Sequence, residues 1–374
     1  MKSNTISKQE IVLIGHPFAP IGRGEDIRSA FRSFKELGCS VEIKDVYGYY
    51  DVWKEFSENI TEELSDFINI FFINGDEVDP ILAKIGDLPE NAYNIIYPAW
   101  ELSIYPEEWL DKLEQFDEIW TISMFVFDSI RSKTKNPIVN MTQASYVEFE
   151  SFIGRQYFGI PESSFVFLFA FDFLSMLHRK NPFAVVESFG LFLKENPNED
   201  VRLVLKLNHS DQKPDDFSAL MNATSSLEEH IIIVDKTLSD NEIKNLVRCS
   251  DCFVSLHRSE GFGRSLSEAM YLGKPVIATA YSGNMDFMTP SNSFLVDFEL
   301  IPVNENEYPH YHHQYWAKAD TTQASLQMQQ VITRRENSRS IGRQASLDMR
   351  RNFSYSAIGS SYVSRINEIK KMKS

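Results

Sequence analysis

The chain has 374 residues, of which 43% are hydrophobic and 24% are charged, and its formal net charge is −16. A chain of this length usually forms two domains, and no apolar run approaches the roughly 20 residues of a membrane span. Residues 1–150 carry 13 basic and 27 acidic residues, whereas residues 151–374 carry 24 and 26. The first half is therefore a poor partner for a nucleic-acid backbone or an anionic membrane.

The N-terminal residues MKSNTISKQE are polar and lead directly into the apolar run IVLIG. This pattern is not that of a secretory signal and favours a cytoplasmic location. The three cysteines, Cys39, Cys249 and Cys252, fit a reducing compartment. Cys249 and Cys252 form a CxxC pair, but a zinc site needs four ligands and no second pair exists, so we expect buried free thiols.

The first half alternates apolar runs with helical patterns. The apolar run 11–15 precedes the glycine-rich turn APIGRGED and a helix over 26–38, in which Gly38 fits a C-cap. Four more strands are expected at 40–46, 67–75, 93–98 and 118–123. This βαβ rhythm predicts a doubly wound parallel sheet.

The rhythm pauses over 154–165 and then restarts. Expected strands follow at 165–171, 201–207, 230–235, 252–257 and 275–279, and expected helices at 182–196, 239–250 and 264–273. A polar helical pattern over 320–374 ends in a basic tail. We therefore expect two Rossmann-like domains, at 1–157 and 158–350, that face each other across a cleft, and a C-terminal helix at 351–374 that packs back on the first domain.

One stretch, SLHRSEGFGRSLSEAMYLGKPVIAT at 255–279, runs from a strand through a Gly-Phe-Gly turn into a helix. The start of a helix presents unpaired N–H groups and a partial positive charge that suit a diphosphate. Glu260 beside the turn could accept hydrogen bonds from sugar hydroxyls, and Glu268 inside the helix could reach a ribose. Alternatively, Glu260 is a solvated loop residue and Glu268 complements the helix dipole. The two glutamates together with the turn favour a ligand site.

The pattern E-G-F-G-x-x-x-x-E from Glu260 to Glu268, followed by AMYLGKPVIAT, resembles family 4 retaining glycosyltransferases of the GT-B fold. The resemblance extends over 160–300. It implies that Glu260 contacts the donor sugar, that Glu268 contacts the nucleotide ribose, and that no metal is needed. The donor diphosphate is then expected at the turn and the first helical turn, formed by Gly261, Phe262, Gly263, Arg264, Ser265 and Leu266.

The same family uses an arginine and a lysine after the first strand of its second domain to neutralise the diphosphate. In FAFDFLSMLHRKNPFAVVESF, Lys180 matches the lysine, while Phe171-Asp172 stands where the usual Gly-Arg pair belongs. Arg179 or Lys206 could take the place of the arginine. Arg179 could equally be a surface side chain.

Two further segments complete the expected donor site. The nucleobase is expected near Asp235 and Leu238. PIGRGED resembles the N-terminal glycine loop of these transferases, which places Gly22 and Gly24 near the donor phosphates. Because Ile27 stands where a dinucleotide fingerprint needs its third glycine, a nicotinamide-type Rossmann enzyme is a poor interpretation.

YPAWELSIYPEEWLDKLEQFDEIWTISMF resembles a segment of bacterial family 4 enzymes that build cell-surface polysaccharides such as O-antigen. Here Trp100 offers a stacking face and Glu101 a hydrogen-bond acceptor for an acceptor sugar, or Trp100 is core and Glu101 a structural charge. His16, at the end of the first strand, is another acceptor candidate or is simply packed. The histidines of 310–313 lack nearby acidic ligands, so we expect a loop without metal.

Together these features predict a retaining glycosyltransferase. It would move a hexose from a GDP- or UDP-linked donor to a glycan or lipid-linked acceptor, in surface polysaccharide or lipopolysaccharide synthesis. The alternative is a non-catalytic subunit that binds a glycan or stabilises a partner transferase. The basic tail SRINEIKKMKS could give peripheral membrane contact, or it is a solvated helix end.

Overall fold

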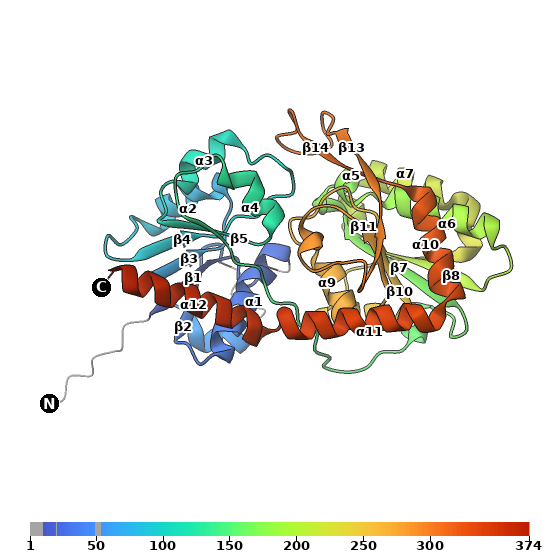
Figure 1. Cartoon of the computed structure of the whole chain (residues 1–374), viewed down its shortest axis with the longest axis horizontal. Coiled ribbons are helices and arrows are strands. Elements are labelled where there is room, and N and C mark those ends of the chain that lie inside the picture. The colour runs from blue at the N-terminus through green and yellow to red at the C-terminus, as the bar shows by residue number, and fades with distance from the viewer. Residues whose placement is uncertain (1–9, 20, 49–53, 374) are drawn as a thin grey trace. The chain divides into compact units, whose positions relative to one another are not determined.

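The computed structural model describes residues 10–19, 21–48 and 54–373, and the chain divides into two compact units. Unit 1 comprises Met1–Ser145 and Asn352–Ser374, and unit 2 comprises Tyr146–Arg351. Each unit is built on a six-stranded sheet with helices (Figure 1). All strand pairs inside these two sheets are parallel, which confirms the predicted α/β class. Pro20 of the expected glycine-rich turn lies outside the described residues.

The sheet of unit 1 has the strand order β2-β1-β3-β4-β5-β6. Because β2 and β3 lie on opposite sides of β1, the winding of the chain reverses between β1 and β3. The strands are β1 (Ile11–Gly15), β2 (Val41–Asp45), β3 (Ile68–Phe71), β4 (Tyr93–Ile96), β5 (Glu118–Thr121) and β6 (Ile138–Asn140). The helices are α1 (Gly22–Glu36), α2 (Val78–Ile85), α3 (Glu107–Leu113), α4 (Met124–Arg131) and α12 (Tyr355–Lys373), with short 3-10 helices η1 (Lys54–Asn59) and η2 (Gly75–Glu77).

The sheet of unit 2 has the order β12-β11-β10-β7-β8-β9, so its winding reverses between β7 and β10. The strands are β7 (Phe165–Asp172), β8 (Val201–Asn208), β9 (Ile231–Asp235), β10 (Cys252–Ser255), β11 (Val276–Thr279) and β12 (Phe294–Val296). A hairpin, β13 (Phe298–Pro302) and β14 (Tyr315–Ala319), forms a separate antiparallel pair.

The helices that accompany the sheet of unit 2 are α5 (Leu177–Lys180), α6 (Pro182–Glu195), α7 (Pro214–Thr224), α8 (Asp240–Cys249), α9 (Arg264–Tyr271), α10 (Thr321–Thr333) and α11 (Arg335–Asn352). The 3-10 helices are η3 (Arg155–Phe158), η4 (Phe173–Ser175), η5 (Ser210–Gln212), η6 (Ser225–His230) and η7 (Gly283–Asp286).

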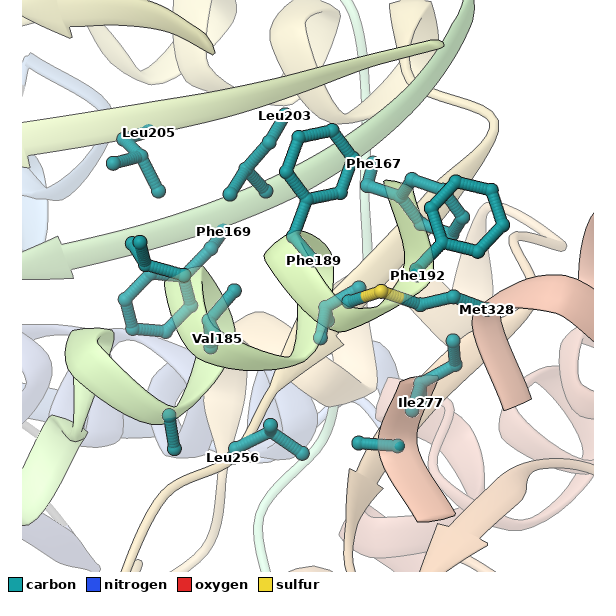
Figure 2. Close-up of a cluster of buried hydrophobic side chains, with 14 of the residues drawn as sticks. Phe167, Phe169, Val185, Phe189, Phe192, Leu203, Leu205, Leu256, Ile277 and Met328 are labelled. Atoms are coloured by element: carbon teal, nitrogen blue, oxygen red, sulfur yellow. The ribbon is translucent and has the colours of Figure 1, made fainter. Parts of the chain in front are cut away.

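Phenylalanine side chains form much of the core of unit 2. The rings of Phe189 and Phe192 on α6 lie 6.2 and 5.9 Å from the ring of Phe167 on β7. Figure 2 shows α6 lying over the strands, with Met328 of α10 beside Phe192. Burying each such side chain contributes about 1.5–3 kcal/mol. These contacts therefore hold α6 firmly against the sheet.

The C-terminal helix α12 packs along α1 within unit 1 (Figure 1). The ring of Tyr362 lies 5.3 Å from that of Phe34. A Cβ atom on Gly359 would lie 2.3 Å from the carbonyl oxygen of Ser33, so glycine allows the two helices to approach closely. The continuous helical pattern expected over 320–374 is divided into α10, α11 and α12.

The first helix differs from its prediction. It begins at Gly22 and not at residue 26, so both glycines of the expected turn belong to its first turn. A Cβ atom on Gly24 would lie 2.1 Å from the carbonyl oxygen of Ala19. Gly24 therefore serves the close packing of the helix start on the preceding chain.

Candidate active site

The loop after β10 carries the pattern that the sequence singles out. β10 ends at Ser255, and Gly263 adopts a left-handed conformation with φ of 98° as the residue before α9. A side chain would strain this conformation, and a Cβ atom here would lie 3.1 Å from Leu266. The glycine thus allows the loop to turn directly into the start of α9.

Glu260 lies in this loop and pairs with two cations. Its Oε2 atom lies 2.9 Å from Arg179 Nη1, and its Oε1 atom lies 2.5 Å from Lys180 Nζ. Burial opposes ionisation of the carboxyl group, but Lys180 and Arg179 outweigh it and lower the pKa of Glu260 to about 2. Glu260 is therefore an ionised carboxylate held between two positive charges.

The sequence after β7 explains why Arg179 and Lys180 point to this loop. They end the short helix α5, and Asn181 then adopts a left-handed conformation with φ of 55° before Pro182 starts α6. The Asn181 side chain donates to the carbonyl oxygen of Leu256 at 2.8 Å. Arg179 also donates to the carbonyl oxygen of Ser259 at 3.1 Å. These bonds fasten the β7 loop to the β10 loop.

A third loop, after β11, positions Glu260 and was not predicted as part of the site. The backbone N–H of Glu260 donates to Ser282 Oγ at 2.8 Å, and its carbonyl oxygen accepts from the Gly283 N–H at 2.9 Å. A Cβ atom on Gly283 would lie 2.0 Å from the carbonyl oxygen of Gly261, so only glycine fits. The dipeptide Ser282-Gly283, two residues beyond the strand PVIAT, was the signal that could have revealed this loop.

His257 is a second residue that the sequence did not indicate. It is fully buried, its Nε2 atom lies 3.1 Å from Asn284 Oδ1, and its Nδ1 atom lies 3.1 Å from Ser255 Oγ. Burial lowers the pKa of His257, which favours a neutral ring. His257 thereby connects the β10 loop to the β11 loop through a buried hydrogen bond.

The other predicted donor residues of the β10 loop lie around the start of α9. Phe262 is buried and packs with Phe287 at 5.1 Å between ring centroids, so its side chain belongs to the core. The first turn of α9 consists of Arg264, Ser265 and Leu266. Glu268 lies farther along the same helix and is half-buried.

Lys206 and Arg179 were alternative substitutes for the missing arginine, and they differ in their surroundings. Only 2% of Lys206 is exposed, and its ammonium group donates to the carbonyl oxygen of Leu207 and to Asn208 Oδ1. Burial lowers the pKa of Lys206 to about 8. Arg179, in contrast, shares Glu260 with Lys180.

The atypical Asp172 has local partners. Its carboxylate accepts from the Leu174 N–H at 2.8 Å and lies 2.8 Å from His209 Nδ1. Asp235, at the end of β9, accepts from Ser210 Oγ at 2.6 Å, and Leu238 lies in the loop before α8. The predicted nucleobase residues therefore stand at the carboxyl edge of the same sheet.

The predicted acceptor residues lie in unit 1. Only 3% of Trp100 is exposed; its indole N–H donates to the carbonyl oxygen of Ile104 at 2.9 Å, and its ring packs with those of Tyr105 and Trp109. The structure thus shows the core alternative for Trp100. Glu101 is half-buried directly after it.

The remaining predictions concern His16, metals and thiols. His16 follows β1 and lies 2.8 Å from Glu77 Oε1. In the part of the chain that the structure describes, no group of three or more potential ligands is arranged for a metal ion, and no helix is long and apolar enough to cross a bilayer. Cys249 and Cys252 are free and buried, as predicted.

The chain resembles known proteins both in part of its sequence and in its fold. Residues 155–301 match the family model "Glycosyl transferases group 1". No curated protein sequence matches the chain. HepE from Anabaena, solved in complex with UDP and glucose, superposes with a TM-score of 0.71 at 13% identity, covering 96% of this chain and 99% of that one.

Two other solved structures resemble the whole chain. A glycosyltransferase from Rickettsia africae gives a TM-score of 0.70 at 16% identity, with 98% of this chain and 99% of that one covered. Sucrose-phosphate synthase from Thermosynechococcus elongatus gives 0.65 at 14% identity, with 98% and 100% covered. The chain therefore has the GT-B fold, carries a glycosyl transferases group 1 domain over residues 155–301, and is a glycosyltransferase.

Proposed function

We propose that the chain transfers a hexose from a nucleotide diphosphate sugar to a glycan or lipid-linked glycan, with retention of configuration and without a metal ion. The observation that carries this proposal is the grouping of Arg179, Lys180 and Glu260 beside the start of α9. Two cations and a helix N-terminus are suited to a departing diphosphate, and a half-buried carboxylate is suited to sugar hydroxyls. HepE, which has the same fold, binds UDP-glucose, and this supports a UDP-linked donor.

Each residue then has a defined role. Lys180 and Arg179 neutralise the diphosphate, and Arg179 replaces the arginine that Asp172 displaces from its usual position. Glu260 exchanges its contact with these cations for hydroxyl groups of the donor sugar. Glu268 binds the ribose.

Other parts of the sheet edge complete the donor site. Asp235 at the end of β9 and Leu238 in the loop that follows bind the base side of the nucleotide. Gly22 and Gly24 of unit 1 stay predictions for the donor phosphates, and Glu101 stays a prediction for a hydrogen bond with the acceptor. Synthesis of a bacterial surface polysaccharide is the role that fits such a reaction.

The test is a hydrolysis screen of UDP- and GDP-linked hexoses by mass spectrometry, comparing the wild type with Glu260→Gln. We expect the wild type to release nucleotide from at least one UDP-hexose. Removing the carboxylate should reduce turnover by on the order of 10², the effect of losing one well-placed polar group. UDP binding should remain or become tighter, because the glutamine no longer competes for Arg179 and Lys180.

The matched control is Glu228→Gln, which changes an exposed glutamate in the same unit and should leave turnover unchanged. Equal turnover in wild type and Glu260→Gln would remove Glu260 from the site. A wild-type protein that neither binds nor hydrolyses any nucleotide sugar would overturn the proposed function itself.

A further inference from the structure

Three polar side chains meet at the carboxyl edge of the unit 1 sheet, where its winding reverses. His16 directly follows β1, Tyr47 follows β2, and Glu77 ends η2 after β3. The strand order β2-β1-β3 places these strand ends side by side. In open α/β sheets, ligands bind outside the carboxyl ends of the strands at such a reversal.

Glu77 is the centre of this cluster. Its Oε1 atom lies 2.8 Å from His16 Nε2 and also accepts from the Tyr47 hydroxyl, while Oε2 accepts from the Asn74 N–H at 2.7 Å. The rings of His16 and Tyr47 are stacked, with centroids 3.4 Å apart and planes inclined by 11°. The three side chains therefore fix one another's orientation.

These contacts determine which nitrogen of His16 carries the proton. Burial opposes ionisation of Glu77, but hydrogen bonds from His16, Tyr47 and the Asn74 amide lower its pKa to about 2. Since an ionised carboxylate only accepts hydrogen bonds, His16 must donate from Nε2. In the neutral ring, Nδ1 then keeps its lone pair. The side chain of His16 is 13% exposed.

The chemistry of the cluster suits an uncharged sugar. Stacked rings offer a surface for the C–H face of a pyranose, and a lone-pair nitrogen accepts from a hydroxyl. A phosphorylated ligand is disfavoured by the charge of Glu77 and by the acidic excess of residues 1–150. The nearby cation Arg23 is paired with Asp26 at 3.0 Å.

We infer that His16, Tyr47 and Glu77 form the binding site for a neutral sugar of the acceptor, in which His16 Nδ1 accepts a hydrogen bond from a sugar hydroxyl. This inference rests on the proposed function, which supplies the acceptor glycan. Tyr47 provides the stacking surface that the buried Trp100 does not. Glu77 is a positioning residue that acts through His16.

Ligand-observed NMR on the full chain tests the site with methyl glucoside, methyl mannoside, methyl galactoside and glucose 6-phosphate as probes. At least one methyl glycoside should bind the wild type. His16→Ala should weaken that binding about fivefold, the loss of about one hydrogen bond. If His16→Ala does not fold, Tyr47→Ala should abolish binding by removing the stacking face, whereas Tyr47→Phe should retain it.

Glu77→Gln separates positioning from a structural role. The glutamine oxygen can still accept from the Asn74 amide, but it carries no charge and no longer fixes the His16 tautomer. Binding of the methyl glycoside should weaken, and the affinity for glucose 6-phosphate relative to that for the methyl glycoside should rise. A folding defect would lower both affinities and leave their ratio unchanged. Glu114→Gln, an exposed glutamate in the same unit, is the matched control.

Two results would overturn the inference: no methyl glycoside binds the wild type, or His16→Ala and Tyr47→Ala both bind as the wild type does. Either result leaves nucleotide-sugar hydrolysis by the wild type untouched, so the proposed function is judged separately by its own screen.

Discussion

Glu260 shows how a single residue combines folding and function. Its negative charge is balanced by Arg179 and Lys180, so neither cation is left unpaired at the sheet edge. Under the proposed function, a diphosphate would take over both cations and leave the carboxylate available to the sugar. The same ion pairs would then both stabilise the fold and prepare the site for its donor.

The lowered pKa of Glu260 predicts a pH-dependent stability. Its pKa in the folded chain is about 2 against an ordinary value of 4.5, so the contribution is complete above pH 4.5 and is lost as the pH falls towards 2. The shift corresponds to roughly 3 kcal/mol. In urea denaturation, Glu260→Gln should be less stable than the wild type at pH 7, and the difference should shrink on acidification.

The control for this measurement is again Glu228→Gln, for which we expect a difference near zero at every pH. A gap between wild type and Glu260→Gln that stays constant from pH 7 to pH 3 would contradict the ion-pair origin of the stability.

At the residue scale, position in the chain is the information that a sequence carries best. Glu260, Lys180 and the glycine turn lie in the connections that follow β10 and β7, so their place at the carboxyl edge of the sheet could be predicted. Trp100 also follows a strand, yet its ring is buried with Tyr105 and Trp109. The spacing of these three aromatic residues in the sequence does not reveal that their rings pack together. Glu77 was missed for a similar reason, since its partner His16 is distant in sequence.

At the scale of elements, the hairpin β13–β14 and its loop are attached to the candidate site. Glu307 in this loop lies 3.2 Å from Arg258 and 3.5 Å from His178, and the N–H of Ala317 on β14 donates to the carbonyl oxygen of Arg258 at 2.9 Å. Arg258 is two residues before Glu260, and His178 directly precedes Arg179. The hairpin thus braces both loops that hold the ion pairs.

We therefore predict that Glu307→Gln lowers turnover several-fold while changing the free energy of unfolding by only about 1 kcal/mol, the size of one partly exposed ion pair. The measurement is nucleotide-sugar hydrolysis together with urea denaturation. Glu305→Gln alters an exposed residue of the same loop and should change neither. Equal turnover in the two variants would show that the hairpin does not brace the site.

Several features of the fold could not be predicted from the sequence, because local patterns do not reveal them. The hairpin and α7 belong to polar stretches in which the apolar period that reveals strands and helices is weak. The break between α10 and α11 falls within the polar helical pattern and is set by where each helix packs. Gly24 was predicted only as a donor contact and Gly359 was not singled out, whereas both glycines allow a close approach of neighbouring backbone.

At the scale of the whole molecule, both units follow the same plan. Each sheet reverses its winding at its first strand, between β1 and β3 and between β7 and β10. In each unit an ionised glutamate at that reversal contacts side chains that follow the first strand: Glu77 with His16, and Glu260 with Arg179 and Lys180. The difference lies in charge, because the cations of unit 2 suit a diphosphate and the carboxylate of unit 1 does not.

Helix α12, with its basic last turn, packs as part of unit 1 and is not a loose tail. Lys370 pairs with Glu10 at 2.9 Å, and Lys373 donates to the carbonyl oxygens of Asn91 and Ala92 at 2.8 and 2.7 Å. These contacts fasten α12 to the fold, so the lysines have protein partners that a membrane would have to replace.

α12 is also attached to unit 1 by an ion pair between residues 247 positions apart. Glu118, which has no exposed surface, accepts from Arg365 Nε at 2.9 Å and Nη2 at 2.6 Å, and from the Trp120 indole N–H at 2.7 Å.

Arg365→Met would leave this carboxylate buried without its cation, at a cost of about 3–5 kcal/mol. Hydrogen exchange should then show a loss of protection in β4, β5 and α12, with β7 and β8 unchanged. Arg131→Met, an exposed arginine of the same unit, should leave all of these segments protected. If Arg365→Met also left them protected, the other contacts of α12 would suffice to hold it, and the ion pair would be dispensable for the fold of unit 1.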